Sequence, residues 1–139
     1  MKVLIDTNII LDFALERQPF YGESEQVFVL AQHRQIEGYV SASTFGDLYY
    51  IIRKDKGRDW TLLFLNRLAA FCEIATVDRT AISMALAANF RDFEDAIQYS
   101  TAVVNQLDAI VTRNTDDFPV ATPRIMTPEQ LIQEVTNSP

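Results

Sequence analysis

Acidic side chains stand at the beginning or end of four predicted elements that lie far apart in the sequence. The four segments are residues 3–8, 41–47, 92–96 and 111–118. If an α/β fold brings them together, they form a pocket of oxygen ligands with almost no counter-charge from the protein. Mg²⁺ prefers oxygen ligands of this kind, and the ligand preferences of Mn²⁺ overlap with those of Mg²⁺. The sequence therefore predicts a site for a divalent metal ion.

The apolar pattern predicts the elements that must position these acids. Short apolar runs of strand length occur at residues 3–5, 39–42, 74–77, 109–111 and 124–126. Helical spacing of apolar residues predicts helices after residue 8, over residues 24–35, 43–57, 60–71, 78–88 and 92–106, and after residue 127. Four or five short strands that alternate with helices favour a mainly parallel sheet covered on both faces. We therefore expect a three-layer α/β/α sandwich, with residues 1–139 as a single domain.

Capping signals mark several predicted helix ends. Asp59 and Asp78 are predicted N-caps, and residues 127–130 have the spacing of a capping box with Pro at the first helical position. The basic run at residues 53–58 is interpreted as the last turn of a helix, with its cations facing the negative helix end and Gly57 just beyond. Contact of this run with phosphate or with an acidic partner is the alternative.

The predicted topology indicates where the acids meet. In open parallel sheets, ligands bind beyond the carboxyl ends of the strands. Asp6 directly follows the first predicted strand, and residues 112–117 directly follow another. Asp47 and Asp95 fall in the first turns of their helices. We therefore expect one rim of the sheet to collect all four segments.

Each of these acids also has a structural interpretation. Asp47 lies three residues after Thr44, and Asp95 lies three residues after Asp92. Acids near a helix N-terminus stabilise the helix through capping and through its dipole. Asp6 is harder to explain in this way. An acid that follows a buried apolar run loses hydration, and this loss costs free energy unless a hydrogen-bond partner compensates it.

Composition narrows the possible functions. Cys72 is the only cysteine and His33 the only histidine, which removes support for internal disulfides, thiolate zinc sites and a Ser/His/Asp triad. The formal net charge of −7 argues against a protein that coats nucleic acid, but a bound metal would offset it in a nuclease. The apolar run at residues 3–5 is too short for a signal peptide or a membrane span, so we expect a cytoplasmic protein.

The four acidic segments resemble, in order and spacing, the motifs of the PIN domain family. The resemblance is carried by residues 4–8, 41–47, 92–96 and 111–118, and it covers nearly the whole chain. Within the family, the chain is most similar to small prokaryotic proteins, many of them toxins of the virulence-associated protein C (VapC) type. The resemblance implies an endoribonuclease that cleaves single-stranded RNA with Mg²⁺, or with Mn²⁺ as a substitute. It also implies a homodimer and, for toxins, a small antitoxin protein that blocks the pocket.

Three acids match the family's metal ligands position by position. Asp6 corresponds to the first ligand, with Asn8 as a polar neighbour that helps to orient it, and Asp95 corresponds to the third. Asp47 stands where the family more often has Glu. Its shorter side chain implies a tighter site or a bridging water.

The fourth ligand has three candidates. Asp117 is favoured because it belongs to the Asp-Phe pair of the last motif. Many family members have an acid where this chain has Asn114, which could act through an intervening water, and Asp116 is the third candidate. Turn chemistry alone is the alternative explanation for the two acids. Thr112 is expected nearby as a hydroxyl donor.

Two other function classes remain open. A PIN-like module that binds RNA or protein with weakened catalysis is consistent with Asp47 and Asn114 at their positions. A metal-dependent phosphatase or phosphoryl acceptor also places an acid after a strand. However, the chain has no Asp-x-Asp pair at Asp6, and no Lys follows the strand at residues 109–111.

Five aromatic side chains bear on possible partners. An interface would use large aromatic groups of this kind, but burial in the core is the preferred interpretation. The five are Phe20, Tyr21, Tyr49, Tyr50 and Trp60.

Overall fold

One fully parallel sheet forms the centre of the protein. The structure, a computed structural model, describes residues 1–137. The strands are β1 (Lys2–Ile5), β2 (Glu37–Ser41), β3 (Glu73–Ala75), β4 (Ala109–Val111) and β5 (Arg124–Met126). Their order across the sheet is β3-β2-β1-β4-β5, and every neighbouring pair is parallel. The chain thus builds outward from β1 to β3, and then returns to add β4 and β5 on the other side of β1.

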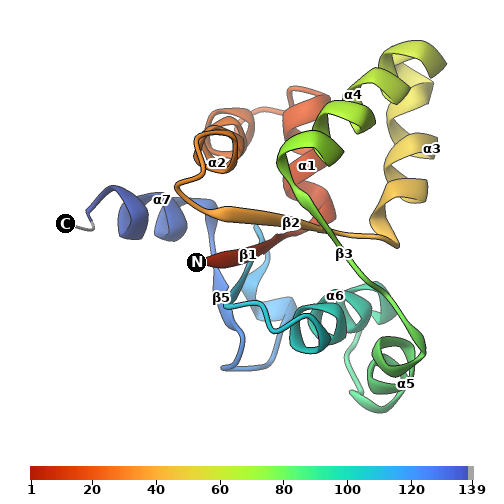
Figure 1. The fold of residues 1–139 in the computed structure, drawn as a ribbon, viewed down its shortest axis with the longest axis vertical. Helices are drawn as coiled ribbons and strands as arrows, with labels where there is room; N and C mark the ends of the chain where they lie inside the picture. Colours follow the sequence, from red (N-terminus) through yellow and green to blue (C-terminus); the bar gives the residue numbers. More distant parts are fainter. Residues whose placement is uncertain (138–139) are drawn as a thin grey trace.

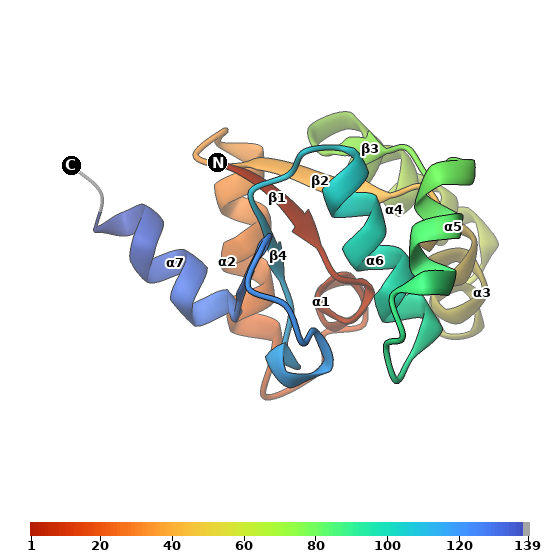
Figure 2. The ribbon, with the colours of Figure 1, turned by 90° about the horizontal axis from the view of Figure 1, so that it is seen from below.

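Helices cover both faces of this sheet. They are α1 (Thr7–Ala14), α2 (Tyr21–Gln32), α3 (Thr44–Lys56), α4 (Arg58–Phe71), α5 (Arg79–Ala87), α6 (Phe93–Val104) and α7 (Pro128–Thr136). Helices α1 to α4 lie on one side and α5 and α6 on the other (Figure 1), while α7 packs beside α2 at the end of the molecule (Figure 2). The predicted three-layer sandwich is confirmed. Across residues 1–137, every helix is too short or too polar to cross a bilayer.

The central strands are apolar on both faces because both faces are covered. Val3 and Ile5 pack into the larger core on the side of α1 to α4, whereas Leu4 packs into the smaller core on the side of α6. Ile110 of β4 joins Leu4 there. Since successive side chains of a strand point to opposite faces, a run of three apolar residues in β1 serves both cores and ends at Asp6.

Several of the predicted helix ends are confirmed. Asp78 accepts a hydrogen bond from the backbone N–H of Ala81 at 3.0 Å, which caps α5. Thr127 and Gln130 form the reciprocal capping box of α7, with distances of 3.0 and 3.1 Å. Gly57 ends α3 at a φ of 82°, in the left-handed region that favours glycine. The basic side chains before it lie in the last turn of α3, as expected.

The prediction that Asp59 caps the next helix is wrong. Helix α4 begins at Arg58, and Gly57 is the residue that precedes it. Asp59 therefore lies inside the first turn, where it is exposed and pairs with Arg58 at 2.8 Å. Because one glycine both ends α3 and begins α4, no separate linker exists in which Asp59 could serve as a cap.

The predicted bounds of three elements are also shifted. Helix α2 begins at Tyr21 and ends at Gln32, rather than covering residues 24–35. Ser24 is buried within it and donates to the carbonyl of Tyr21 at 2.9 Å. Strands β2 and β3 begin before their apolar runs, since Glu37 pairs beside Lys2 and Glu73 beside Tyr39 in the sheet. Pairing with a neighbouring strand, and not apolarity alone, therefore sets these ends.

A buried ion pair joins α1 to the segment that follows β4. Asp12 is fully buried, and both of its carboxylate oxygens accept hydrogen bonds from Arg113, at 2.7 and 3.3 Å. The Arg113 guanidinium lies 4.0 Å from the centre of the Phe20 ring, and Arg17 approaches the same carboxylate to 3.9 Å. Because Arg113 stands at the start of the acidic segment after β4, this pair fixes the direction in which that segment leaves the sheet.

Loss of this pair should destabilise the protein strongly. Arg113→Met leaves a buried carboxylate without its bidentate partner, and we expect a loss of about 3 kcal/mol in the free energy of unfolding. Urea unfolding at neutral pH measures the change. Arg124→Met is the matched control, because Arg124 pairs with Glu134 at the surface, where water screens the charges, and its loss should be much smaller. Equal losses in the two variants would contradict the assignment.

Candidate active site

The acidic segments meet in one pocket beyond the carboxyl ends of the central strands. The pocket has a volume of about 360 Å³. Six of the predicted site residues line it, namely Asp6, Asn8, Asp47, Asp95, Asn114 and Asp117. Thr112 is buried and contacts Asp6, whereas Asp116 is not part of the lining. Four elements that are distant in the sequence therefore contribute to one concave surface.

Asp6 lies at the point where the order of the strands reverses. Its strand, β1, pairs with β2 on one side and with β4 on the other. The Asp6 carboxylate accepts hydrogen bonds from the Thr112 hydroxyl and from the Thr7 backbone N–H, both at 2.9 Å. These bonds satisfy an acid that is only 6% exposed, and they make Asp6 the N-cap of α1. Asp6 thus has a structural role in addition to its place in the pocket.

The capping interpretation is confirmed for one of the two residue pairs with a spacing of three, Asp92 and Asp95, and not for Thr44 and Asp47. Asp92 accepts a hydrogen bond from the Asp95 backbone N–H at 3.1 Å and is the N-cap of α6. Thr44 is not a cap, because it is the first residue of α3, and Ser43 before it makes no capping bond with its side chain. The interpretation of Thr44 and Asp47 as a capping pair is therefore wrong. Asp47 lies in the first turn of α3 and lines the pocket.

Four further polar residues line the pocket that the sequence analysis did not assign to the site. They are Asp92, Glu94, Gln98 and Thr7. Asp92 and Glu94 belong to the same acidic segment as Asp95, so the sequence could have indicated that they lie near the pocket. Gln98 follows Asp95 by three residues and therefore lies on the same side of α6. Apart from this spacing, nothing in the sequence indicated that a glutamine at this position belongs to the site.

Crowding and burial shift the pKa values of these acids. The lining carries six carboxylates, and none of the described residues in it is a lysine, arginine or histidine. The pKa of Asp95 rises to about 7, mainly through burial and then through the negative charges of Asp6 and Asp92. Burial also raises the pKa of Asp6 despite its two hydrogen bonds. It raises the pKa of Glu94 as well, with Asp47 as the strongest charged neighbour.

The donor set of the pocket suits a hard divalent cation. Its polar atoms are carboxylate, amide and hydroxyl oxygens, which are ligands for Mg²⁺ or Mn²⁺. Within residues 1–137, no three Asp, Glu, His or Cys side chains come close enough together to ligate one ion directly. The carboxylates surround the pocket instead of meeting at a point. This arrangement fits a cation that keeps several waters and takes only one or two carboxylates directly, as Mg²⁺ does.

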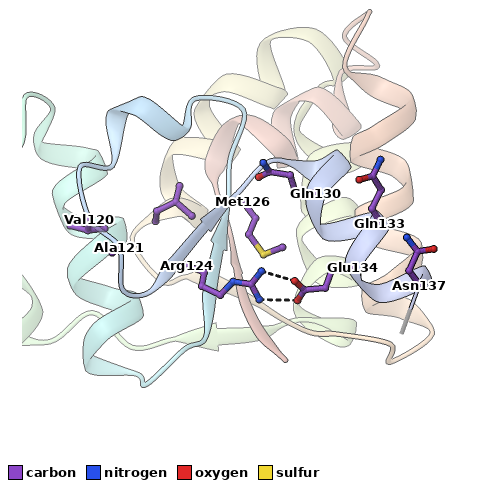
Figure 3. Close-up of a pocket in the computed structure, with 9 residues that line it drawn as sticks. Val120, Ala121, Arg124, Met126, Gln130, Gln133, Glu134 and Asn137 are labelled. Carbon is purple, nitrogen blue, oxygen red and sulfur yellow. Dashed lines mark hydrogen bonds and ion pairs between the residues drawn. The ribbon is translucent and has the colours of Figure 1, made fainter. Parts of the chain in front are cut away.

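A wider hollow of about 790 Å³ lies between β5 and α7. Figure 3 shows Arg124 and Glu134 paired there, with one of their hydrogen bonds at 2.8 Å. Among the described residues that line this hollow, these two are the charged ones, and their charges offset each other. We therefore take the acidic pocket as the candidate active site.

The fold and the pocket define an α/β protein with an oxygen-rich site at the switch point of a parallel sheet. The sequence model of the PIN domain matches residues 2–116, and the chain therefore belongs to the PIN domain family. The resemblance of the chain to this family is thus confirmed. No curated protein sequence matches the chain.

Solved structures with the same fold include VapC toxins. A toxin–antitoxin complex from Klebsiella pneumoniae is 24% identical, with a TM-score of 0.69 over 91% of this chain and 97% of that chain. VapBC-1 from nontypeable Haemophilus influenzae is 14% identical, with a TM-score of 0.68 over 93% and 99%. VapC20 from Mycobacterium tuberculosis, a Sarcin-Ricin loop cleaving toxin, is 10% identical, with a TM-score of 0.63 over 78% and 86%. At these identities the likeness establishes the fold.

The raised pKa of Asp95 predicts how the stability of the metal-free protein depends on pH. Asp95 titrates near 3.8 in an unfolded chain and at about 7 in the folded protein, so between these values the folded state binds more protons. Through this group, the free energy of unfolding is highest at low pH and falls as the pH rises towards 7. Asp95→Asn removes the effect. Relative to wild type, the variant should therefore be more stable at pH 8, with a smaller advantage at pH 5.

Urea unfolding in EDTA at the two pH values measures this difference. Asp55→Asn, which removes an exposed acid outside the pocket, controls for the loss of one negative charge. An advantage of Asp95→Asn that is the same at both pH values would show that the pocket does not raise the pKa of Asp95.

Proposed function

We propose that the protein is a metal-dependent endoribonuclease that hydrolyses phosphodiester bonds of single-stranded RNA, and that it is the toxin of a type II toxin–antitoxin pair. The observation that carries the proposal is the pocket itself, in which six carboxylates from four separate elements lie together without a lysine, arginine or histidine in the described lining. Such crowding destabilises the folded protein unless a positive charge offsets it. A structural role alone explains it poorly, and membership of the PIN domain family supports nuclease chemistry.

The proposed metal-binding acids are Asp6, Asp47, Asp95 and Asp117, of which one or two would contact the ion directly and the others through its waters. Mg²⁺ is the preferred ion and Mn²⁺ the substitute. Thr112 keeps the Asp6 carboxylate aligned through its hydrogen bond, and Asn8 and Asn114 add amide groups to the lining. When bound, the ion orients the scissile phosphate, lowers the pKa of a water and offsets charge on the leaving oxygen. We expect products with a 5′-phosphate and a 3′-hydroxyl.

Glu94 is a candidate to supply the reach that Asp47 lacks. Asp47 is one methylene shorter than the Glu that is more usual at its position. Glu94 lines the same pocket, and among its charged neighbours Asp47 has the strongest effect on its pKa. A longer carboxylate from α6 is thus available near the shorter one from α3.

RNA as the substrate is supported by one neighbour and by the chemistry of the pocket. VapC20 from Mycobacterium tuberculosis, which has the same fold, is a Sarcin-Ricin loop cleaving toxin. Its 10% identity does not extend that target to this chain. A divalent cation held by carboxylates matches the needs of phosphodiester hydrolysis, because it interacts with both the phosphate and the attacking water.

An antitoxin and a second copy of the chain are the proposed protein partners. The neighbours from Klebsiella pneumoniae and Haemophilus influenzae are toxin–antitoxin complexes. Phe20, Tyr50 and Trp60 are 39%, 61% and 42% exposed, so the interpretation of these three as core residues is wrong. Exposed aromatic side chains are enriched at protein interfaces, which supports a partner surface. We expect the protein to act in the cytoplasm, where its RNA substrate would be.

A PIN-like RNA- or protein-binding module with weakened catalysis is the second candidate. It is favoured by the separation of the acids, since no three of the candidate ligand groups in residues 1–137 converge on one point. The short side chain of Asp47 favours it too. A phosphatase is less well supported, because the described lining contains no lysine to bind a phosphoryl group.

An RNA cleavage assay with Mg²⁺ or Mn²⁺ tests the proposal. We expect wild type to cut a single-stranded RNA and EDTA to abolish the cut, because the acids cannot act on phosphate without a cation. Asp6→Asn and Asp95→Asn should lose activity while the metal-free proteins remain as stable as wild type or more so. Asp55→Asn is the control that should retain activity.

The possible outcomes separate the candidate functions. RNA binding without cleavage by wild type would favour the weakened module, and release of phosphate from a monoester would favour the phosphatase. Unchanged cleavage by both pocket variants would reject the assigned site. Unfolding of both variants would show that the two acids are mainly structural.

Three variants test the identity of the fourth ligand. Asp117→Asn should weaken Mn²⁺ binding in calorimetry, because its carboxylate lines the pocket. Asp116→Asn should change the affinity little, since Asp116 lies outside the lining. Asn114→Asp should strengthen binding and should partly restore it in the Asp117→Asn protein. A larger loss for Asp116→Asn than for Asp117→Asn would reverse the assignment.

A further inference from the structure

Three uncharged side chains form a hydrogen-bonded junction at the wall of the acidic pocket. The Nε2 atom of Gln98 donates to the hydroxyl of Thr7 at 3.1 Å and to that of Thr44 at 3.3 Å. The two hydroxyl oxygens are themselves 3.3 Å apart. Gln98 and Thr44 are buried, with 4% and 2% exposure. The junction therefore ties the first residues of α1 and α3 to the middle of α6.

Each member of the junction is closely linked along the backbone to one proposed metal ligand. The links are either between adjacent residues or across three residues, which is close to one helical turn. Residues three apart on a helix lie on the same side of it. The three links are Thr7 to Asp6, Thr44 to Asp47 and Gln98 to Asp95. Fixing the junction thus fixes the relative positions of the backbone segments that carry three acids.

The neutrality of the junction suits this position. A lysine or arginine at residue 98 would pair with the pocket carboxylates and compete with a cation, and a glutamate would add to the repulsion. An amide and two hydroxyls join the three helices without changing the net charge. Gln98 thus connects the acid-bearing helices and leaves the charge of the pocket to be offset by a bound ion.

The second amide atom of Gln98 argues against a role in stability alone. Its Oε1 is buried and has no hydrogen-bond partner in the structure. A buried unpaired amide oxygen is destabilising, so an apolar side chain of the same length would serve the core at least as well. The glutamine is therefore better explained by what its Nε2 holds in place.

We propose that Gln98 is a positioning residue that sets the spacing of the acids around a hydrated divalent cation. It acts through Thr7 and Thr44 and does not touch the substrate. Its effect on catalysis rests on the proposed nuclease function. Its effect on ion binding is independent of the substrate and can be measured without RNA.

Gln98→Met tests the proposal, because methionine keeps the length of the side chain and removes both donated hydrogen bonds. We expect Mn²⁺ affinity, measured by calorimetry, to fall by about 10-fold to 100-fold, the usual effect of losing a group that orients metal ligands. In RNA cleavage, kcat should fall with little change in KM. Urea unfolding in EDTA should show little change in stability, since removal of a buried unpaired oxygen offsets the two lost hydrogen bonds and the two hydroxyls still bond each other.

Thr101→Val is the matched control. Thr101 lies on the same helix, is fully buried, and has a hydroxyl without a partner in the structure, but it does not line the pocket. Its substitution should leave Mn²⁺ affinity unchanged. An equal loss of affinity in both variants would mean that any change in the packing of α6 disturbs the site, and would overturn the proposal.

A double-mutant cycle with Thr44→Val tests whether the junction acts as a unit. If it does, the double variant should lose no more Mn²⁺ affinity than Gln98→Met alone. Thr44→Val also carries the test if Gln98→Met fails to fold. Additive losses, or wild-type affinity in both single variants, would overturn the proposal. If wild type binds Mn²⁺ but does not cleave RNA, the nuclease function is rejected, and the test of Gln98 as a positioning residue still stands. If wild type does not bind Mn²⁺, both the nuclease function and the role of Gln98 are overturned.

Discussion

The parallel pairing of β4 beside β1 is the constraint on which the acidic pocket depends. It brings the Thr112 hydroxyl to 2.9 Å from the carboxylate of Asp6, although the two residues are 106 positions apart in the chain. Parallel strands send their carboxyl ends to the same edge of a sheet, so the segments after β1 and β4 must meet there. With β2 on the other side of β1, α3 also begins at this edge. The pocket is thus a direct consequence of strand order, and the acids occupy the positions that this order makes adjacent.

Capping and metal binding are compatible uses of the same acids. Asp6 caps α1 and Asp92 caps α6, while Asp47 and Asp95 lie in the first turns of α3 and α6. Three helix N-termini therefore contribute partial positive charge to a pocket that lacks basic side chains among its described lining residues. This contribution does not offset burial and the negative charges of Asp6 and Asp92, which together raise the pKa of Asp95 to about 7. The helix ends make the crowding tolerable in the folded protein, and enough negative charge remains to attract a cation.

Sequence reasoning predicted the layers and the convergence of the acids because both follow from the order of the elements. Two local patterns carry that information: the spacing of the apolar residues, and acids at the end of a strand, as Asp6 is, or in the first turn of a helix, as Asp95 is. The first residues of β2 and β3 and the role of Asp59 were mispredicted, since they depend on strand pairing and on a glycine shared by two helices. The junction at Gln98 was out of reach for a different reason. Hydrogen bonds between neutral side chains on three distant elements leave no local pattern, and a buried glutamine resembles an exposed one in sequence.

The arginine next to the acidic segment that follows β4 is held away from the pocket by an acid of its own. Arg113 lies between Thr112 and Asn114, yet its guanidinium pairs with buried Asp12 and stacks on Phe20, on the wall of a neighbouring hollow. It lowers the pKa of Asp6 only as a minor influence beside burial and hydrogen bonding. An arginine in the pocket would neutralise carboxylates and would compete with a metal ion for them. The pairing with Asp12 therefore does two things at once, because it anchors the acidic segment after β4 and keeps the negative charge of the pocket available for a cation from solution.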